Sequence, residues 1–182
     1  MAGPNEVPSN EADENQLRIA REEGAVYQKA LKYMVEEVAD NGAQRTVGDY
    51  RIGIAQEEAE GMYRLVGEGQ LEWQEPQGEN CHLEVSISDA GDHRFVPGLS
   101  IEVTLTPKSG GAPVGPIQVP FLWHPGLYHY GANLTVPGDG TYDVKVVIAP
   151  AEFMRHDKRN GERYSKTVEV TFPDFEIKTG SE

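Results

Sequence analysis

The stretch CHLEVSI, residues 81–87, alternates apolar and polar side chains in the two-residue period of a β-strand. Successive strand side chains point to opposite faces, so the odd-numbered residues form an apolar face suited to a core. His82 and Glu84 share the polar face, with Cα atoms about 7 Å apart from twice the strand rise. That spacing lets both side chains reach one ion. The alternative is that this face simply meets water.

The two-residue period continues through most of the chain beyond Thr46. Clusters of Gly, Pro, Asn and Asp, such as Asp89-Ala-Gly-Asp92, separate one predicted strand from the next. The predicted strands are Asp49–Ala55, Met62–Val66, Gln70–Trp73, Asn80–Ile87, Leu99–Leu105, Ile117–Leu122, Tyr130–Val136, Thr141–Ile148 and Lys166–Phe172. Short strands with no helix between them predict a mainly β fold, an immunoglobulin-like two-sheet sandwich over residues 46–178.

The residues before the sandwich follow another pattern. Residues 1–13 are polar, acidic and proline-containing, which predicts a disordered tail. Over residues 14–42 apolar side chains recur every three or four positions, which predicts an amphipathic helix with a stop signal at Asn41-Gly42. The apolar face consists of Leu17, Ala20, Gly24, Tyr27, Leu31, Met34 and Val38. Docking of this face on the sandwich is the first interpretation, and a dimer contact is the second.

The overall charge restricts the class of partner. The 182-residue chain carries a formal net charge of −14, which argues against nucleic-acid binding and favours attraction of cations. Cys81 is the only cysteine, so no internal disulfide can form. No run approaches the ~20 apolar residues of a spanning helix, so direct membrane insertion is not expected. The N-terminus lacks the pattern of a signal peptide, which leaves a cytoplasmic location open.

Histidines near predicted turns are the main candidates for function. Neutral imidazole is a common ligand for Cu, Fe, Ni and Zn, and the chain has only five histidines. His124 and His129 flank a Pro-Gly turn among aromatic residues, and His156 lies in a charged loop further on. For His124 a ligand role and a structural role in the turn are equally open, whereas a ligand role is favoured for His129.

These residues resemble motifs of the periplasmic Fe2+-transport family, immunoglobulin-like copper- and iron-binding proteins that accompany bacterial iron permeases. The resemblance covers roughly residues 48–177. It rests on His82-Leu-Glu84, on His129-Tyr-Gly-Ala-Asn133 followed by Gly140-Thr-Tyr-Asp-Val-Lys-Val, and on Arg155-His156-Asp-Lys before the last strand. It implies a periplasmic homodimer that binds Cu2+ through His82, His129 and His156, assisted by Glu84, with a membrane iron permease as partner.

The chain departs from that family at two positions. The family's methionine seven residues before His129 is Leu122 here, and a second histidine of the His82 strand is Ser88. His124 could replace the methionine, which would harden the site away from Cu(I) because thioether is the softer ligand. The predicted N-terminal helix is also unusual for the family.

Three functions are consistent with these observations. The first is a non-catalytic protein that binds Cu2+ or Fe2+, with Zn2+ as a further candidate, and assists bacterial iron uptake. Its candidate ligands are His82, Glu84, His124, His129 and His156. The second is a non-haem Fe(II) enzyme, because His82-x-Glu84 with a distant histidine also matches a two-His-one-carboxylate site. The third is a protein-interaction module that uses the helix. The sequence favours the first, non-enzymatic function.

Overall fold

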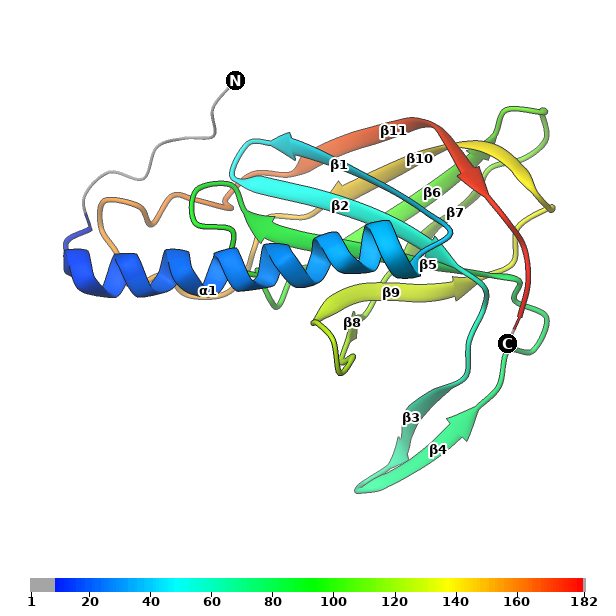
Figure 1. The fold of residues 1–182 in the computed structure, drawn as a ribbon, viewed down its shortest axis with the longest axis horizontal. Helices are drawn as coiled ribbons and strands as arrows, with labels where there is room; N and C mark the ends of the chain where they lie inside the picture. The colour runs from blue at the N-terminus through cyan, green and yellow to red at the C-terminus, as the bar shows by residue number, and fades with distance from the viewer. Residues whose placement is uncertain (1–8, 182) are drawn as a thin grey trace.

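Two antiparallel sheets stack face to face in the computed structural model, which describes residues 9–181 (Figure 1). The first sheet contains, in spatial order, β1 (Asn41–Val47), β2 (Tyr50–Glu57), β5 (Cys81–Asp89), β9 (His129–Leu134) and β8 (Phe121–Leu122). The second contains β11 (Val168–Ile177), β10 (Gly140–Ile148), β6 (Ile101–Pro107) and β7 (Val114–Gln118). The predicted immunoglobulin-like sandwich is therefore confirmed.

The core lies between the sheets, and it is built from the alternating apolar residues of each strand. The odd-numbered residues 81–87 of β5 are fully buried in one cluster with Val103 of β6 and Val144 of β10. Each such side chain stabilises the fold by roughly 1.5–3 kcal/mol through removal of apolar surface from water. This pattern forces the even-numbered side chains of β5 onto the outer face of the first sheet.

A long helix, α1 (Glu14–Tyr33), lies against that outer face (Figure 1). It begins with a capping box, in which the Asp13 carboxylate accepts from the Gln16 N–H and the Gln16 side chain accepts from the Asp13 N–H. A π-helical turn, η1 (Met34–Val38), follows it. The predicted apolar stripe faces the sheet as far as Met34, whereas Val38 is 49% exposed.

The helix ends earlier than the sequence predicted, because residues 41–47 form strand β1. This strand pairs with β2 from Asn41 opposite Gln56 to Val47 opposite Tyr50. Gly42 allows the backbone to pass close to the preceding turn, where a Cβ would lie 2.5 Å from a methyl carbon of Val35. Of the predicted tail, residues 1–8 lie outside the described part, and the Asn10 side chain accepts a hydrogen bond from the Lys158 N–H.

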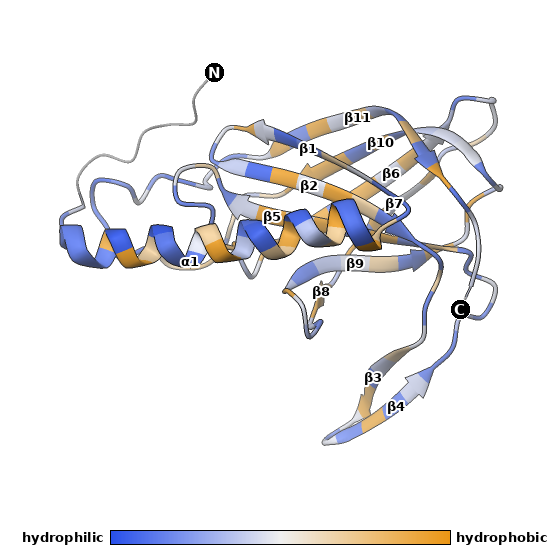
Figure 2. Cartoon of the chain, viewed as in Figure 1, coloured by the Kyte–Doolittle hydropathy of each residue, from blue (hydrophilic) through white to orange (hydrophobic). Residues whose placement is uncertain are grey.

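A separate hairpin, β3 (Met62–Gly67) and β4 (Gln70–Gln74), projects away from the sandwich (Figure 1). Both strands were predicted, but they join neither sheet. Orange bands on the hairpin in Figure 2 mark hydrophobic residues, and the side chains of Leu65 and Leu71 are 69% and 62% exposed. The predicted strand Ile117–Leu122 divides into β7 and β8, which belong to different sheets on either side of Val119 and Pro120.

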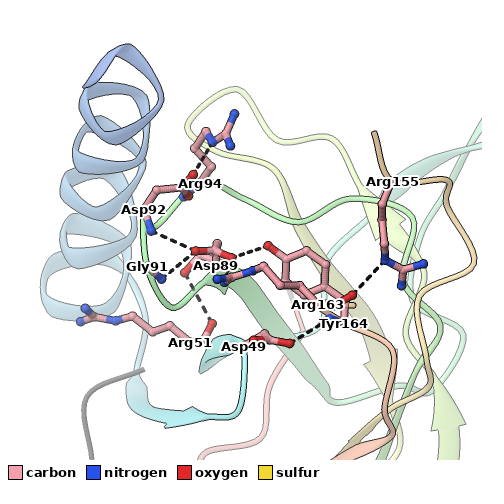
Figure 3. Close-up of polar contacts among 10 residues, drawn as sticks. Asp49, Arg51, Asp89, Gly91, Asp92, Arg94, Arg155, Arg163 and Tyr164 are labelled. Atoms are coloured by element: carbon pink, nitrogen blue, oxygen red, sulfur yellow. Dashed lines mark hydrogen bonds and ion pairs between the residues drawn. The ribbon is translucent and has the colours of Figure 1, made fainter. Parts of the chain in front are cut away.

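A buried polar network holds the loop that carries His156 at the C-terminal end of β5 (Figure 3). The Asp89 carboxylate, at the last residue of β5, accepts from the Arg163 guanidinium and the Tyr164 hydroxyl. Arg155 in turn donates to the backbone carbonyl of Arg163 at 2.9 Å. The network therefore fixes the position of residues 150–164 relative to the first sheet.

Candidate metal centre

Three predicted ligand residues converge on the outer face of the first sheet. His82 and Glu84 extend from β5 and His129 from the start of β9, and one ligand atom from each lies within 4.8 Å of the others. Two bonds of about 2.1 Å to one ion allow ligand atoms up to about 4.2 Å apart, so small side-chain movements would bring all three to one ion. Two imidazoles and a carboxylate suit a borderline divalent metal.

The three side chains are buried, although they lie on the outer face of the sheet. His82 is 0% exposed, Glu84 6% and His129 3%. Helix α1 covers the neighbouring part of this face, where Tyr27 contacts Ser86, and Glu60 lies beside His82. The alternative in which this polar face of β5 meets water is therefore wrong. A set of buried polar groups of this kind needs a partner.

The His82 ring is oriented by Asn133, which lies opposite it on β9. The Nδ1 atom of His82 lies 2.9 Å from Oδ1 of Asn133, while the Asn133 amide nitrogen donates to the Glu60 carbonyl at 2.7 Å. Because an amide oxygen only accepts, Nδ1 carries the proton and donates. Nε2 therefore presents a lone pair to the site. Metal-binding histidines are commonly held in this way, with the second ring nitrogen donating a hydrogen bond to a neighbouring acceptor.

The Nε2 atoms of His82 and His129 are buried and make no hydrogen bond of normal geometry within residues 9–181. The Nε2 of His129 lies 3.2 Å from a Glu84 carboxylate oxygen, and that of His82 lies 3.6 Å from a Glu60 oxygen. The two imidazole rings meet edge to face with centroids 6.4 Å apart. Two unsatisfied buried nitrogens beside a carboxylate fit a metal ion that binds both of them.

Burial shifts the protonation of these groups in opposite directions. It lowers the pKa of His129 to about 4, with smaller contributions from the neighbouring His82 and His124, and it also lowers the pKa of His82. Burial, helped by the charges of Glu57 and Glu60, raises the pKa of Glu84 to about 8. At neutral pH the imidazoles are therefore neutral and ready to bind a metal, whereas Glu84 must first lose a proton.

A cleft of about 980 Å³ leads from solvent to this cluster. Glu60, the β3–β4 hairpin, Gln118 and residues 120–125 line it, together with His129 and Gly131. His124 is half-buried on its wall, with its ring centroid 6.1 Å from that of His129. Its Nδ1 accepts from the Gly126 N–H at 3.0 Å, which leaves Nε2 as the atom available for a ligand.

His156 does not join the cluster within one chain. Its side chain is 97% exposed, and Nδ1 lies 3.2 Å from a Glu11 carboxylate oxygen. The Asp89 network holds its loop at the end of β5, and the five residue steps from Glu84 to Asp89 alone span about 17 Å. This separation could not be predicted from the sequence, because a long loop can reach many positions.

Several residues around the site were not predicted from the sequence. Asn133 shares one face of β9 with His129 by the two-residue period, so that alternation could have identified it. Glu57, the last residue of β2, and Glu60 occur in an acidic run, a pattern that usually indicates a solvated surface. Gly131 is needed for space, because a Cβ there would lie 3.0 Å from Nε2 of His82.

Solved structures of two bacterial proteins, FetP and P19, share the fold of this chain. The chain has a TM-score of 0.60 with FetP of uropathogenic E. coli strain F11, at 24% identity over 77% of this chain and 95% of that one. A copper-bound variant of the same FetP matches at 22% identity over 78% and 93%, again with a TM-score of 0.60. Copper-reconstituted P19 of Campylobacter jejuni also gives 0.60, at 19% identity over 77% and 94%.

An immunoglobulin-like sandwich with buried imidazole and carboxylate groups beside a cleft defines a metal-binding β-domain. The Fe2+ transport protein family matches residues 65–179, more than half of the chain. The protein belongs to this family, as the sequence resemblance predicted. A search of curated proteins gives no significant match. No helix within residues 9–181 is long and apolar enough to cross a membrane.

Proposed function

We propose that the protein binds Cu2+ or Fe2+ without catalysing a reaction and handles the ion for bacterial iron uptake. The proposed ligands are His82, Glu84 and His129. The observation that carries this proposal is the pair of buried Nε2 atoms that make no hydrogen bond of normal geometry and converge with the Glu84 carboxylate. Membership of the Fe2+ transport family supports the biological role.

The donor set favours Cu2+ over the other candidates in a test tube. Two imidazoles and a carboxylate bind borderline divalent ions, and the Irving–Williams order places Cu2+ above Fe2+ and Zn2+. The copper-bound FetP and P19 structures share this fold. Rotation of His124 toward its neighbour His129 would supply a fourth ligand, and the acidic Glu57 and Glu60 attract a cation to the cleft.

Metal titration tests this function directly. Purified protein would be titrated with Cu2+ and, without oxygen, with Fe2+ at neutral pH, beside His129→Ala and the control His93→Asn. His93 lies in a turn at φ 66°, a conformation that Asn accepts, so the control removes one histidine without backbone strain. We expect one equivalent of Cu2+ to bind to wild type and the control, and at least a hundredfold loss in His129→Ala. Absence of binding to wild type would refute the metal function and favour an interaction module.

A second copy of the chain is the partner that we propose for the exposed hairpin. Tyr63, Leu65 and Trp73 of the hairpin are 66%, 69% and 52% exposed, and Trp123 across the cleft is 70% exposed. A group of large exposed apolar side chains around one cleft is typical of a protein interface. In a homodimer, His156 of one copy is free to reach the cluster of the other, which its own chain does not allow.

The family resemblance also suggests a partner protein and a cellular compartment. We infer a membrane iron permease as the recipient of the ion and the periplasm as the location. The acidic character of the chain, with a net charge of −14, suits concentration of cations near its surface.

A second candidate function is a non-haem Fe(II) enzyme. The cluster of two histidines and one carboxylate is the ligand set of such oxygenases, which keep open positions on the iron. Oxygen uptake by the Fe2+-loaded protein, measured with an oxygen electrode, separates the two functions. Uptake that stops after one equivalent supports a binding protein, whereas continued turnover with a reduced co-substrate supports the enzyme.

A further inference from the structure

Helix α1 contacts the backbone peptide that precedes the proposed ligand His129. The Tyr27 hydroxyl donates to the carbonyl of Tyr128 at 2.8 Å and lies 3.1 Å from the Ser86 hydroxyl. Because its single proton goes to the carbonyl, the Tyr27 oxygen accepts from Ser86. One hydroxyl therefore joins β5, helix α1 and the residue adjacent to His129.

The next turns of the helix hold the same segment from its apolar side. Leu31 of α1 and Met34 are buried in a small cluster with Leu127, two residues before His129. This cluster is separate from the core between the sheets. The segment between β8 and β9 therefore rests on the helix as well as on the sheet.

The position of Tyr27 along the sheet is fixed by a close approach of backbones. Gly24, one turn earlier in the helix, lies so near the turn after β5 that a Cβ would be 1.8 Å from the Asp92 carbonyl oxygen. The Tyr27 ring also packs on Phe95, at 5.6 Å between ring centroids. The carboxylate of Glu84 is near enough to contribute, after burial, to a raised pKa of Tyr27, which keeps the phenol protonated as a donor.

We propose that Tyr27 is a positioning residue of the metal centre, and that α1 sets the geometry of His129 through the Tyr128 carbonyl. This inference rests on the proposed metal function. It gives the N-terminal helix a role in the site, because hydrogen bonds one step removed from a metal orient its ligands and tune its affinity.

The test compares Tyr27→Phe with Tyr33→Phe in the full-length protein. Both substitutions remove one hydroxyl from the same helix, but Tyr33 is 64% exposed and outside the site. We expect about a tenfold weaker Cu2+ affinity in Tyr27→Phe and a displaced visible absorption band of the bound ion, with neither change in Tyr33→Phe. The displaced band is the decisive readout, because lower fold stability alone would not move it.

Each remaining outcome identifies which proposal fails. Unchanged affinity and an unchanged band in Tyr27→Phe, with His129→Ala unable to bind, would overturn the role of the helix and leave the metal function intact. Lack of Cu2+ binding by wild type would overturn both. If Tyr27→Phe does not fold, Tyr27→Met removes the same hydroxyl and fills the space with a flexible apolar side chain. An unchanged band in that variant would likewise overturn the inference.

Discussion

Burial of Glu84 favours its protonated form, whereas metal binding requires its ionised form. Its folded pKa of about 8 lies above the ordinary 4.5, so the metal-free folded state holds a proton at pH 7 that the unfolded state does not. The stability that Glu84 contributes in its protonated form is fully present below about pH 4.5 and is lost as the pH rises through 8. His129 has the opposite effect, because its folded pKa of about 4 lies below the ordinary 6.5. As the pH falls from 6.5 toward 4, the unfolded state binds a proton that the folded state does not, and the folded protein loses stability.

Metal binding should therefore release a proton from Glu84. At pH 7 we expect close to one proton per Cu2+ bound, falling toward zero above about pH 9, because the carboxylate must ionise to act as a ligand. Calorimetry in two buffers of different ionisation enthalpy measures the number. Glu84→Gln serves as the control and should bind weakly without proton release. Equal binding enthalpies in both buffers at pH 7 would contradict the assignment.

The same carboxylate should destabilise the metal-free protein at alkaline pH. We expect Glu84→Gln to raise the free energy of unfolding at pH 9 by about 1–3 kcal/mol, because it removes a buried charge that has no metal. At pH 5, where Glu84 is protonated, the difference should shrink toward zero. Urea unfolding at the two pH values provides the comparison, and a pH-independent difference would argue against a buried carboxylate.

Gly131 shows how the site depends on space as well as on ligands. A Cβ at this position would lie 3.0 Å from His82 Nε2 and 3.1 Å from the Leu83 carbonyl, so Gly131→Ala should displace the His82 ring. We expect at least tenfold weaker Cu2+ binding and about 1–3 kcal/mol lower stability. Gly67→Ala is the matched control, since its Cβ would meet only the flexible side chain of Gln70. Equal losses in both variants would rule out the steric explanation.

At the scale of elements, periodicity predicted the strands and the apolar stripe of the helix, but not what covers each face. The alternation in β5 correctly placed His82 and Glu84 together on one face. It carried no information about the outer layer, so burial under α1 could not be foreseen. Strand β1 was missed because its residues are mostly polar and its stability comes from pairing with β2 rather than from an apolar pattern.

The contact between α1 and the turn after β5 reverses an ordinary helix preference. A Gly→Ala change inside a helix normally stabilises by about 1 kcal/mol. Gly24→Ala should instead destabilise by about 1–3 kcal/mol, because its Cβ would overlap the Asp92 carbonyl and lift the helix. Thermal unfolding would show a lower midpoint for Gly24→Ala. Glu23→Ala, on the exposed side of the helix, is the control and should change the stability by close to zero. Stabilisation by Gly24→Ala would mean that the helix does not dock closely.

At the scale of the whole molecule, the positions of His129 and His156 at separate places of one chain allow a test by complementation. Neither His129→Ala nor His156→Ala should hold Cu2+ tightly if each site takes His156 from a second copy. In a mixed dimer, however, the His156→Ala copy keeps His82, Glu84 and His129, and the His129→Ala copy supplies His156. One complete site should return per mixed dimer, so an equimolar mixture refolded together should bind about a quarter of the wild-type copper tightly. Tight Cu2+ binding by His156→Ala alone, with dimers present by sedimentation, would place His156 outside the site, and the ion would then rest on the ligands of one chain.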